Sequence, residues 1–150
     1  VSTKFKAPIE HSRPKGGGVA AFKLEDVAGK WQLAPAWLSR DMDLAEETVI
    51  ANGIVFVYSS GVDGTQVVQD AAWNEPGGPV YGGALSSGAA RRIPNSRKAI
   101  LYALDGQTGK ELWNSGDTIT SWNHFSGITV ANGRVYIGTW DGMLYAFGVR

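Results

Sequence analysis

The clearest pattern of hydrophobic and polar positions lies at residues 99–113. Residues 100–104 form a short, β-rich apolar run, which predicts a strand covered on both faces. Residues 105–109 then stop the strand, because aspartate caps its own backbone and glycine accepts positive φ. Residues 110–113 begin a return strand that carries Trp113 as its large apolar side chain. The stretch therefore predicts a β-hairpin.

This hairpin belongs to an internal repeat. Leu-Tyr-Ala-Leu at residues 101–104 recurs as Leu-Tyr-Ala-Phe at residues 144–147, a shift of 43 residues. Residues 22–30 match the same hairpin at a shift of 80 residues. The two shifts differ by 37 residues, which is the length of the stretch 61–97, rich in Gly, Pro, Ser and Ala. One repeat unit therefore carries a long insertion.

Further strands are expected on both sides of the hairpin, joined by short turns. They are expected at residues 19–24, 30–38, 48–51, 54–60, 127–131, 134–140 and 143–147, with a turn at residues 25–29. The Asn-Gly pairs at 52–53 and 132–133 are the strongest two-residue signal for a type I′ turn. Residues 1–18 are expected to be irregular with a short strand at residues 2–6, and residues 39–47 to form a polar connection.

The pattern predicts an all-β segment that contains essentially no helix. Four antiparallel strands per unit, a period near 43 residues and tight turns are typical of a β-propeller blade. Residues 1–150 are interpreted as one segment, with blade strands at 19–60 and 98–148 and a loop insertion at 61–97. About two blades are present, so the ring is partial, and neighbouring blades from the rest of a parent chain, or other chains, are expected to complete it. The last expected strand has no outer partner after it, which predicts that Arg150 is near the true C-terminus.

Composition and charge narrow the function classes. The chain has 14 basic and 14 acidic residues, and this balance argues against nucleic acid as a partner. The basic pairs at residues 91–92 and 97–98 are interpreted as solvated loop charges. Cysteine is absent, which removes disulfides, thiolate metal sites and cysteine nucleophiles. No apolar run approaches the roughly 20 residues needed to span a bilayer.

Two motifs carry a family resemblance. Ala-Leu-Asp-x-x-Thr-Gly-Lys-x-x-Trp at residues 103–113 resembles the tryptophan-docking repeat of the quinoprotein propellers, and residues 130–146 resemble the other half of that repeat. This family contains alcohol dehydrogenases that depend on pyrroloquinoline quinone (PQQ) and the propeller lipoprotein of outer-membrane barrel assembly. The upstream unit departs from the motif, since Leu33 occupies the docking-tryptophan position. The resemblance implies an eight-bladed parent ring and a periplasmic or secreted setting. The motif residues are Asp105, Thr108, Gly109, Lys110 and Trp113.

The docking motif has a physical rationale. A tryptophan at position 113 can bury a large surface between adjacent blades while its indole N–H finds a carbonyl. We therefore expect Trp113→Ala to destabilise the full-length parent protein by roughly 3–5 kcal/mol.

The resemblance also places a candidate ligand site. In quinoprotein dehydrogenases the cofactor lies on the axial face, formed here by the connections 39–47, 117–125 and 61–97. The candidate cofactor-binding residues are Arg40, Asp41, Asp43, Trp122, Asn123 and His124. An indole can stack under a quinone, a guanidinium can pair with its carboxylates, and Asp and Asn oxygens can ligate calcium. The alternative is structural, with Trp122 as blade packing, Arg40 in an ion pair with Asp41 or Asp43, and His124 as a hydrogen-bonding anchor.

Three functions remain open from the sequence. The first is a PQQ-dependent oxidoreductase that removes hydride from a small alcohol or sugar, with calcium polarising the quinone. The second is a non-catalytic propeller scaffold that binds protein or glycan partners, which exposed Trp73 and Tyr81 in the insertion would favour. The third is a structural repeat without a ligand. The vicinal cysteine pair of many of those dehydrogenases and a Cys-x-x-Cys-His haem signature are both missing from the sequence.

Overall fold

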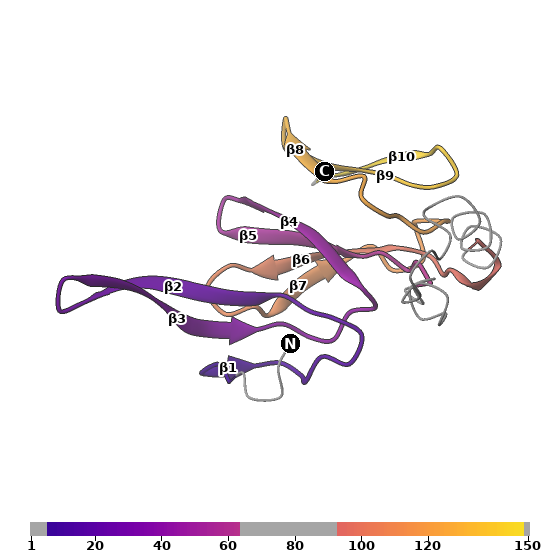
Figure 1. The fold of residues 1–150 in the computed structure, drawn as a ribbon. Helices are drawn as coiled ribbons and strands as arrows, with labels where there is room; N and C mark the ends of the chain where they lie inside the picture. Colours follow the sequence, from indigo (N-terminus) through magenta and orange to yellow (C-terminus); the bar gives the residue numbers. More distant parts are fainter. Residues whose placement is uncertain (1–5, 64–92, 149–150) are drawn as a thin grey trace, which may run out of the picture.

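The computed structural model describes residues 6–63 and 93–148, which form an all-β structure of three small sheets (Figure 1). A single helical turn at residues 93–95 is the only α-helix in this part of the chain. The first sheet has the order β1-β3-β2, from β1 (Ile9–Glu10), β2 (Ala20–Val27) and β3 (Lys30–Leu38). The second has the order β4-β5-β6-β7, from β4 (Ala45–Ala51), β5 (Ile54–Ser59), β6 (Ile100–Asp105) and β7 (Glu111–Asn114). The third has the order β10-β9-β8, from β8 (Ile128–Ala131), β9 (Arg134–Gly138) and β10 (Leu144–Gly148).

The second sheet confirms the predicted hairpin and extends it into an up-and-down antiparallel meander. One cross-strand row runs from Thr48 through Val57 and Tyr102 to Asn114. β5 and β6 are therefore neighbours, although the insertion separates them in sequence. Strand β4 begins at Ala45, three residues earlier than expected, because an irregularity between Ala45 and Thr48 lets pairing with β5 continue.

Short turns with positive φ close three hairpins. In the Asn52-Gly53 turn φ is 50° and 76°, and in the Asn132-Gly133 turn it is 50° and 70°. Both central residues of each turn therefore have positive φ, as a type I′ turn requires. The first hairpin is tighter than expected. Its turn is the pair Ala28-Gly29 alone, with φ of 54° and 77°, so β2 continues to Val27 instead of ending at residue 24.

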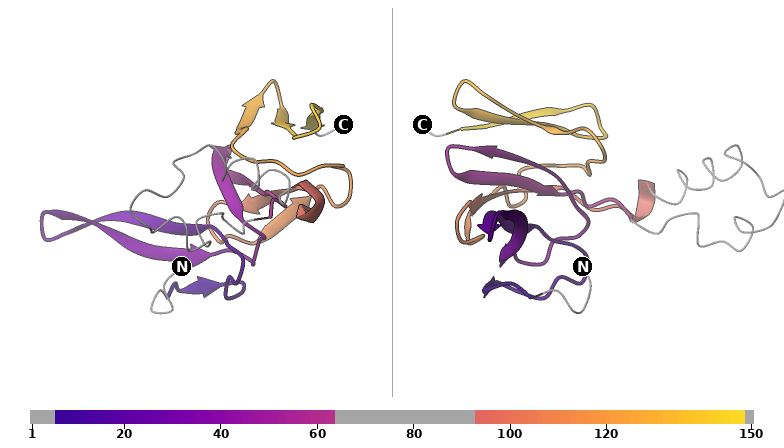
Figure 2. Two further views of the ribbon diagram at one scale, coloured as in Figure 1. Left: turned by 45° about the vertical axis from the view of Figure 1, so that its right-hand side comes forward. Right: turned by 60° about the vertical axis from the view of Figure 1, so that its left-hand side comes forward.

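The sheets lie as successive layers, and both faces of the central sheet are covered (Figures 1 and 2). Alternate residues of β6 serve the two cores: Leu101 packs towards the third sheet, and Leu104 packs towards the first sheet. The core shared with the third sheet contains Tyr58, Ala99, Leu101, Ile119, Ile128, Val135 and Ile137. The core shared with the end of β3 contains Trp37, Met42, Val55, Val57, Tyr102 and Leu104. The prediction that residues 100–104 are covered on both faces is thus confirmed.

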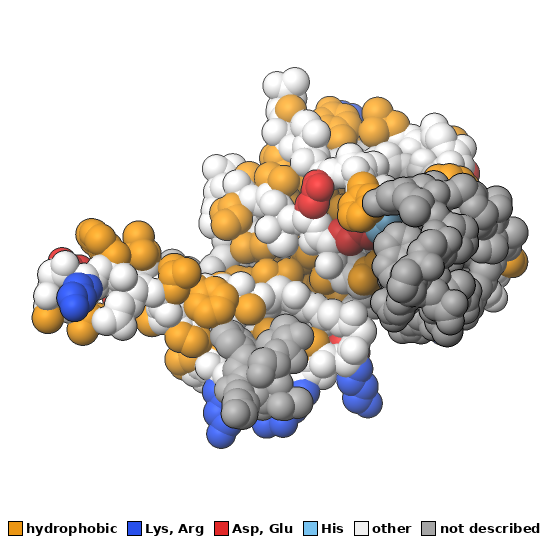
Figure 3. Space-filling model, viewed as in Figure 1, with side chains coloured by type: hydrophobic (Ala, Val, Ile, Leu, Met, Phe, Trp, Pro, Cys, Tyr) orange, Lys and Arg blue, Asp and Glu red, His pale blue; other side chains and the backbone are white. Residues whose placement is uncertain are grey.

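The β2–β3 hairpin projects beyond these layers (Figure 1). Its register places Phe22 opposite Pro35, Leu24 opposite Leu33 and Asp26 opposite Trp31. Since side chains alternate between faces of a strand, the apolar members of these pairs share one face. Four of them, Phe22, Leu24, Trp31 and Leu33, are exposed, and hydrophobic side chains line the projecting hairpin in Figure 3. The only short strand in the described N-terminal residues is Ile9–Glu10, parallel to β3; the strand expected at residues 2–6 lies almost wholly outside the described residues.

Trp37 is the side chain that packs the first sheet against the second. The repeat alignment places the docking position at Leu33 instead. The Trp37 indole is 2% exposed, and its Nε1–H donates to the Gly106 carbonyl at 3.0 Å. A Cβ built on Gly109 would lie 2.4 Å from Trp37 Cε3, so the indole rests directly on the glycine backbone. Leu33 is exposed. The docking tryptophan of this hairpin therefore lies beyond Leu33, close to the end of β3.

The motif turn that receives Trp37 is held by its own side chains. Asp105 Oδ1 accepts the backbone N–H of Gln107 and of Thr108, at 3.1 and 2.7 Å, and the Thr108 hydroxyl at 2.7 Å. Gly109 has a φ of 71°, and the Lys110 carbonyl accepts the Asp105 N–H. These contacts fix the turn in a conformation whose flat glycine backbone fits an indole ring.

Trp113 meets the expectation for a docking residue only in part. Its ring lies 5.3 Å from that of Phe147 in the third sheet, but it remains 43% exposed. The burial expected for it is therefore incomplete in this chain. An apolar cleft of about 480 Å³ adjoins it, lined by side chains of the second and third sheets that include Phe56, Leu112, Val130 and Phe147.

Candidate functional site

The predicted connections come together at one end of the sheets. Asn123 N–H donates to the Ser60 carbonyl at 3.0 Å, which joins the loop after β7 to the start of the insertion. Ala99 N–H donates to the Ser121 carbonyl at 2.9 Å, which joins the same loop to the end of the insertion. The start of β4, which falls within the predicted connection 39–47, reaches this loop through Glu46. Segments far apart in sequence thus form one loop face; Trp73 and Tyr81 of the insertion lie outside the described residues.

Glu46 is the centre of this face. Its Oε1 lies 2.8 Å from His124 Nδ1, and its Oε2 accepts the Tyr58 hydroxyl at 2.8 Å and the Phe125 N–H at 2.9 Å. The Glu46 side chain is nearly buried, and the His124 side chain is mostly buried. One carboxylate therefore ties two strands of the second sheet to a loop that lies 78 residues further along the chain.

The electrostatics of this cluster favour an ionised Glu46. Burial opposes ionisation, but the Phe125 N–H, His124 and Tyr58 all donate to the carboxylate, and together they lower the pKa of Glu46. Burial, and then the hydrogen bond to Glu46, raise the pKa of the Tyr58 hydroxyl. Tyr58 is therefore a fixed hydrogen-bond donor at neutral pH, with no tendency to ionise.

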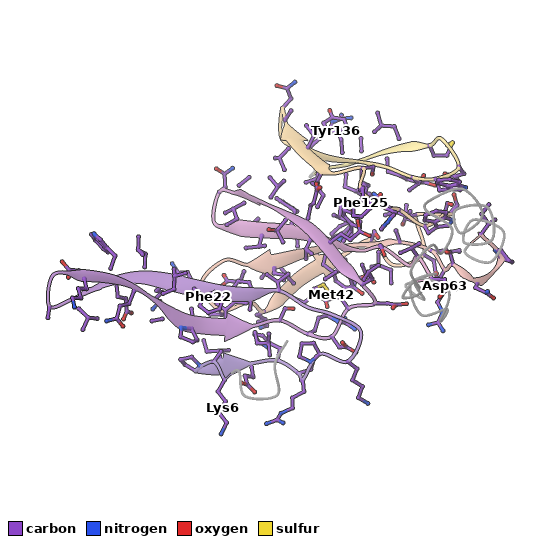
Figure 4. All side chains as sticks on the ribbon, viewed as in Figure 1. Lys6, Phe22, Met42, Asp63, Phe125 and Tyr136 are labelled. Carbon is purple, nitrogen blue, oxygen red and sulfur yellow. The ribbon has the colours of Figure 1, made fainter. Side chains whose placement is uncertain are left out.

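Phe125 lies beside this cluster in a strained conformation. Its φ is 59°, a region that non-glycine residues seldom adopt, and its ring lies 3.7 Å from that of His124. Figure 4 shows Phe125 between the second sheet and the β8–β10 sheet. The side chain is 76% exposed, whereas its backbone N–H is fixed by Glu46. The cluster thus holds an aromatic side chain out towards solvent.

Arg40 and Asp41 have structural partners elsewhere. Arg40 Nη1 is 2.7 Å from Glu111 Oε2, and its guanidinium lies 5.2 Å from the centre of the Tyr102 ring. The hydrogen bond to Glu111, opposed by burial, raises the pKa of Arg40 further. Asp41 Oδ1 accepts the backbone N–H groups of residues 15–17 at 2.6, 3.0 and 3.4 Å. The ion pair of Arg40 is therefore made with Glu111, and not with Asp41 or Asp43.

The remaining candidates also make packing contacts. The backbone carbonyl of Asp43 accepts the Ser59 hydroxyl at 2.6 Å. Trp122 is buried and stacks on Trp140, with ring centres 4.5 Å apart and 17° between the planes. Asn123 is 1% exposed, and its Oδ1 accepts the Ser126 hydroxyl at 2.7 Å, while its buried Nδ2 has no hydrogen-bond partner.

Five of the six predicted residues divide between two clusters, and the sixth, Asp43, contacts Ser59 through its backbone carbonyl. Arg40 and Asp41 contact residues 15–17, Tyr102 and Glu111. Trp122, Asn123 and His124 contact Glu46, Ser60, Ser126 and Trp140. Sequence analysis missed Glu46, Tyr58, Phe125 and Trp140. Of these, only Trp140 carried a local signal, as a tryptophan directly before the Asp141-Gly142 turn.

Among the described residues, no group of three or more His, Cys, Asp or Glu side chains is arranged to hold a metal ion. None of the helical structure in those residues is long and apolar enough to cross a membrane. Comparisons with protein-family models, with curated proteins and with solved structures found no match to this chain.

Proposed function

We propose that the chain is a segment of a β-propeller built from quinoprotein-like repeats. The observation that supports this most strongly is the layer order: a complete four-stranded meander lies between two incomplete sheets, each packed against one of its faces. Such a meander is the unit from which propellers are built. The docking of Trp37 on Gly109 supports the family resemblance, because it joins one unit to the motif turn of the next.

The same proposal accounts for the exposed apolar surfaces. The apolar face of the β2–β3 hairpin corresponds by the 80-residue shift to the Tyr102 and Leu104 face of β6, which the first sheet covers. Neighbouring units of a longer ring would cover the hairpin in the same way. Trp113 would dock in the same way on the motif turn that completes the third sheet beside β10, as Trp37 docks on Gly109.

We further propose that this segment is a non-catalytic scaffold, whose loop face binds protein or glycan partners. The supporting observation is that three of the side chains expected to hold PQQ and calcium already serve the fold. The Arg40 guanidinium pairs with Glu111, Asp41 is satisfied by three backbone N–H groups, and Trp122 is buried against Trp140. The Arg40 guanidinium and the Trp122 indole therefore do not fit a quinone site, because each would have to leave its present contact to reach the cofactor.

The experiment is a titration of the full chain with PQQ and calcium. Tryptophan fluorescence reports binding, and reduction of an artificial electron acceptor in the presence of alcohols and sugars reports turnover. The scaffold proposal expects no dye reduction and no saturable quenching that depends on Trp122. Saturable quenching that disappears in Trp122→Ala, together with dye reduction, would replace it with the PQQ-dependent oxidoreductase. A periplasmic or secreted location, which belongs to the same proposal, is tested by fractionating cells that express the parent protein.

A further inference from the structure

The loop face carries an exposed tryptophan on a rigid support. Trp140 follows β9 and is 60% exposed. One face of its indole lies on the buried ring of Trp122 at a centre-to-centre distance of 4.5 Å. The backbone N–H of Trp140 also donates to the backbone carbonyl of Trp122 at 2.9 Å. Since one face is covered by Trp122, the opposite face and edge account for the exposure, and the ring is held flat towards solvent.

A hydrogen-bonding rim adjoins this indole. Asp141 Oδ1 accepts the Thr139 hydroxyl at 2.5 Å, and its Oδ2 accepts the Thr120 hydroxyl at 3.1 Å. The Thr120 hydroxyl also lies 2.7 Å from the Tyr145 hydroxyl. The carboxylate is exposed, and the Thr139 bond is the main reason that the pKa of Asp141 is lowered. Asp141 Oδ1 also accepts the Met143 N–H at 3.4 Å. An ionised carboxylate has about four lone-pair positions, so about one remains for a further donor.

This combination selects a ligand class. The electron-rich face of an indole attracts the weakly positive C–H groups on the flat side of a sugar ring, and it also offers a large apolar contact. An ionised carboxylate at the rim accepts sugar hydroxyls, whereas it repels an anionic ring. Binding sites commonly combine one such aromatic surface with a few fixed polar groups.

We propose that Trp140, supported by Trp122 and flanked by Asp141, is a subsite for a neutral carbohydrate ring. The proposal rests on the scaffold function above, and it names glycan as the partner class and this turn as its place of binding. Phe125, on the same loop face, offers a second exposed aromatic ring for an extended oligosaccharide.

The test uses the indole N–H signals of the six tryptophans in ¹H–¹⁵N spectra of the full chain. The chain is titrated with malto-, cello-, xylo- and chito-oligosaccharides. The proposal expects at least one series to shift the Trp140 and Trp122 signals saturably, while the Trp31 signal stays fixed. Trp140→Ala should weaken binding at least tenfold. Trp31→Ala is the matched control, because Trp31 is similarly exposed but lies on the β2–β3 hairpin, and it should leave binding unchanged.

A second variant keeps the test decisive if Trp140→Ala does not fold. Asp141→Asn keeps the size of the side chain but removes its charge and one acceptor oxygen, and it should reduce affinity severalfold with an unchanged spectrum outside this turn. Absence of any shift with all four series at millimolar concentration, or shifts that persist in Trp140→Ala, would overturn the subsite. Sugar binding accompanied by dye reduction with PQQ would keep the subsite and overturn the scaffold function, so the two failures are distinguishable.

Discussion

The contact between Trp37 and Gly109 offers the sharpest test of how the sheets are joined. Replacement of Trp37 by alanine removes a fully buried indole and the hydrogen bond from its Nε1–H to the Gly106 carbonyl. Burial of a large aromatic side chain and the cavity left by its removal are together worth roughly 3–5 kcal/mol. The Gly106 carbonyl also loses its hydrogen-bond donor, which costs about 1 kcal/mol. We therefore expect the loss in the free energy of unfolding to lie near the upper end of this range.

The assay is urea unfolding of the full chain, followed by far-ultraviolet circular dichroism. Trp31→Ala is the matched control, because this indole is 69% exposed on the projecting hairpin. We expect the control to change the free energy of unfolding by less than about 1 kcal/mol, since exposed substitutions away from special features usually have small effects. Equal unfolding midpoints for Trp37→Ala and Trp31→Ala would refute the docking assignment.

A double-mutant cycle isolates the contact itself. Gly109→Ala should also destabilise the chain, because the new Cβ would lie 2.4 Å from Trp37 Cε3 and because φ is +71° at that position. The backbone strain alone costs roughly 1–2 kcal/mol. Once Trp37 is alanine, only that strain should remain, so the two changes should be non-additive by about 1 kcal/mol or more. Additive effects would show that the indole does not rest on the glycine.

Three further outcomes follow from the contacts above. Trp113→Ala should lower the free energy of unfolding of this chain by less than half as much as Trp37→Ala does, since Trp113 remains 43% exposed; urea midpoints measured side by side check this. Glu46→Gln should cost about 1–3 kcal/mol at pH 7, because a nearly buried carboxylate loses charge-assisted hydrogen bonds. The folded pKa of Glu46 is lowered, so its contribution is present above the ordinary pKa of about 4.3 and is lost as pH falls through the folded value; the gap between wild type and variant should therefore close in acid, and a constant gap would contradict the assignment. Arg40→Ala should cost less than about 1 kcal/mol in the same assay, because the Arg40–Glu111 pair is partly exposed and screened, and a larger loss would show a role beyond this pair.

Local features of the fold were predictable because short stretches of sequence determine them. The Asn-Gly turns at 52–53 and 132–133 and the hairpin at 99–113 depend on neighbouring residues, and all three form as expected. The docking position was not predictable from the repeat alignment, which assigned it to Leu33. Trp37 takes that place through contacts with Gly106 and Gly109 in another sheet, and such a contact depends on the assembled fold and not on the local sequence.

The candidate site was predictable in its place but not in its contacts. The predicted connections 39–47 and 117–125 meet as expected, through Glu46 and His124, since strand order fixes which segments share an end of the sheets. Glu46 carried no local signal, because its partners lie 12 and 78 residues away and depend on the completed fold. Asp41 was a candidate calcium ligand because a loop carboxylate needs a positively polarised partner. In the structure that partner is a set of backbone N–H groups at residues 15–17, and the sequence alone does not identify it.

The central claim is that the sheets stack as successive units of one repeat. The most direct test is a nuclear Overhauser measurement on the full chain between the ring protons of Trp37 and the α-protons of Gly109. The structure predicts strong cross-peaks, with the Gly109 α-protons shifted upfield by the indole above them. Gly109 α-protons at ordinary chemical shift, with Trp37 cross-peaks only to residues of its own hairpin, would contradict the stacking and the propeller proposal that rests on it.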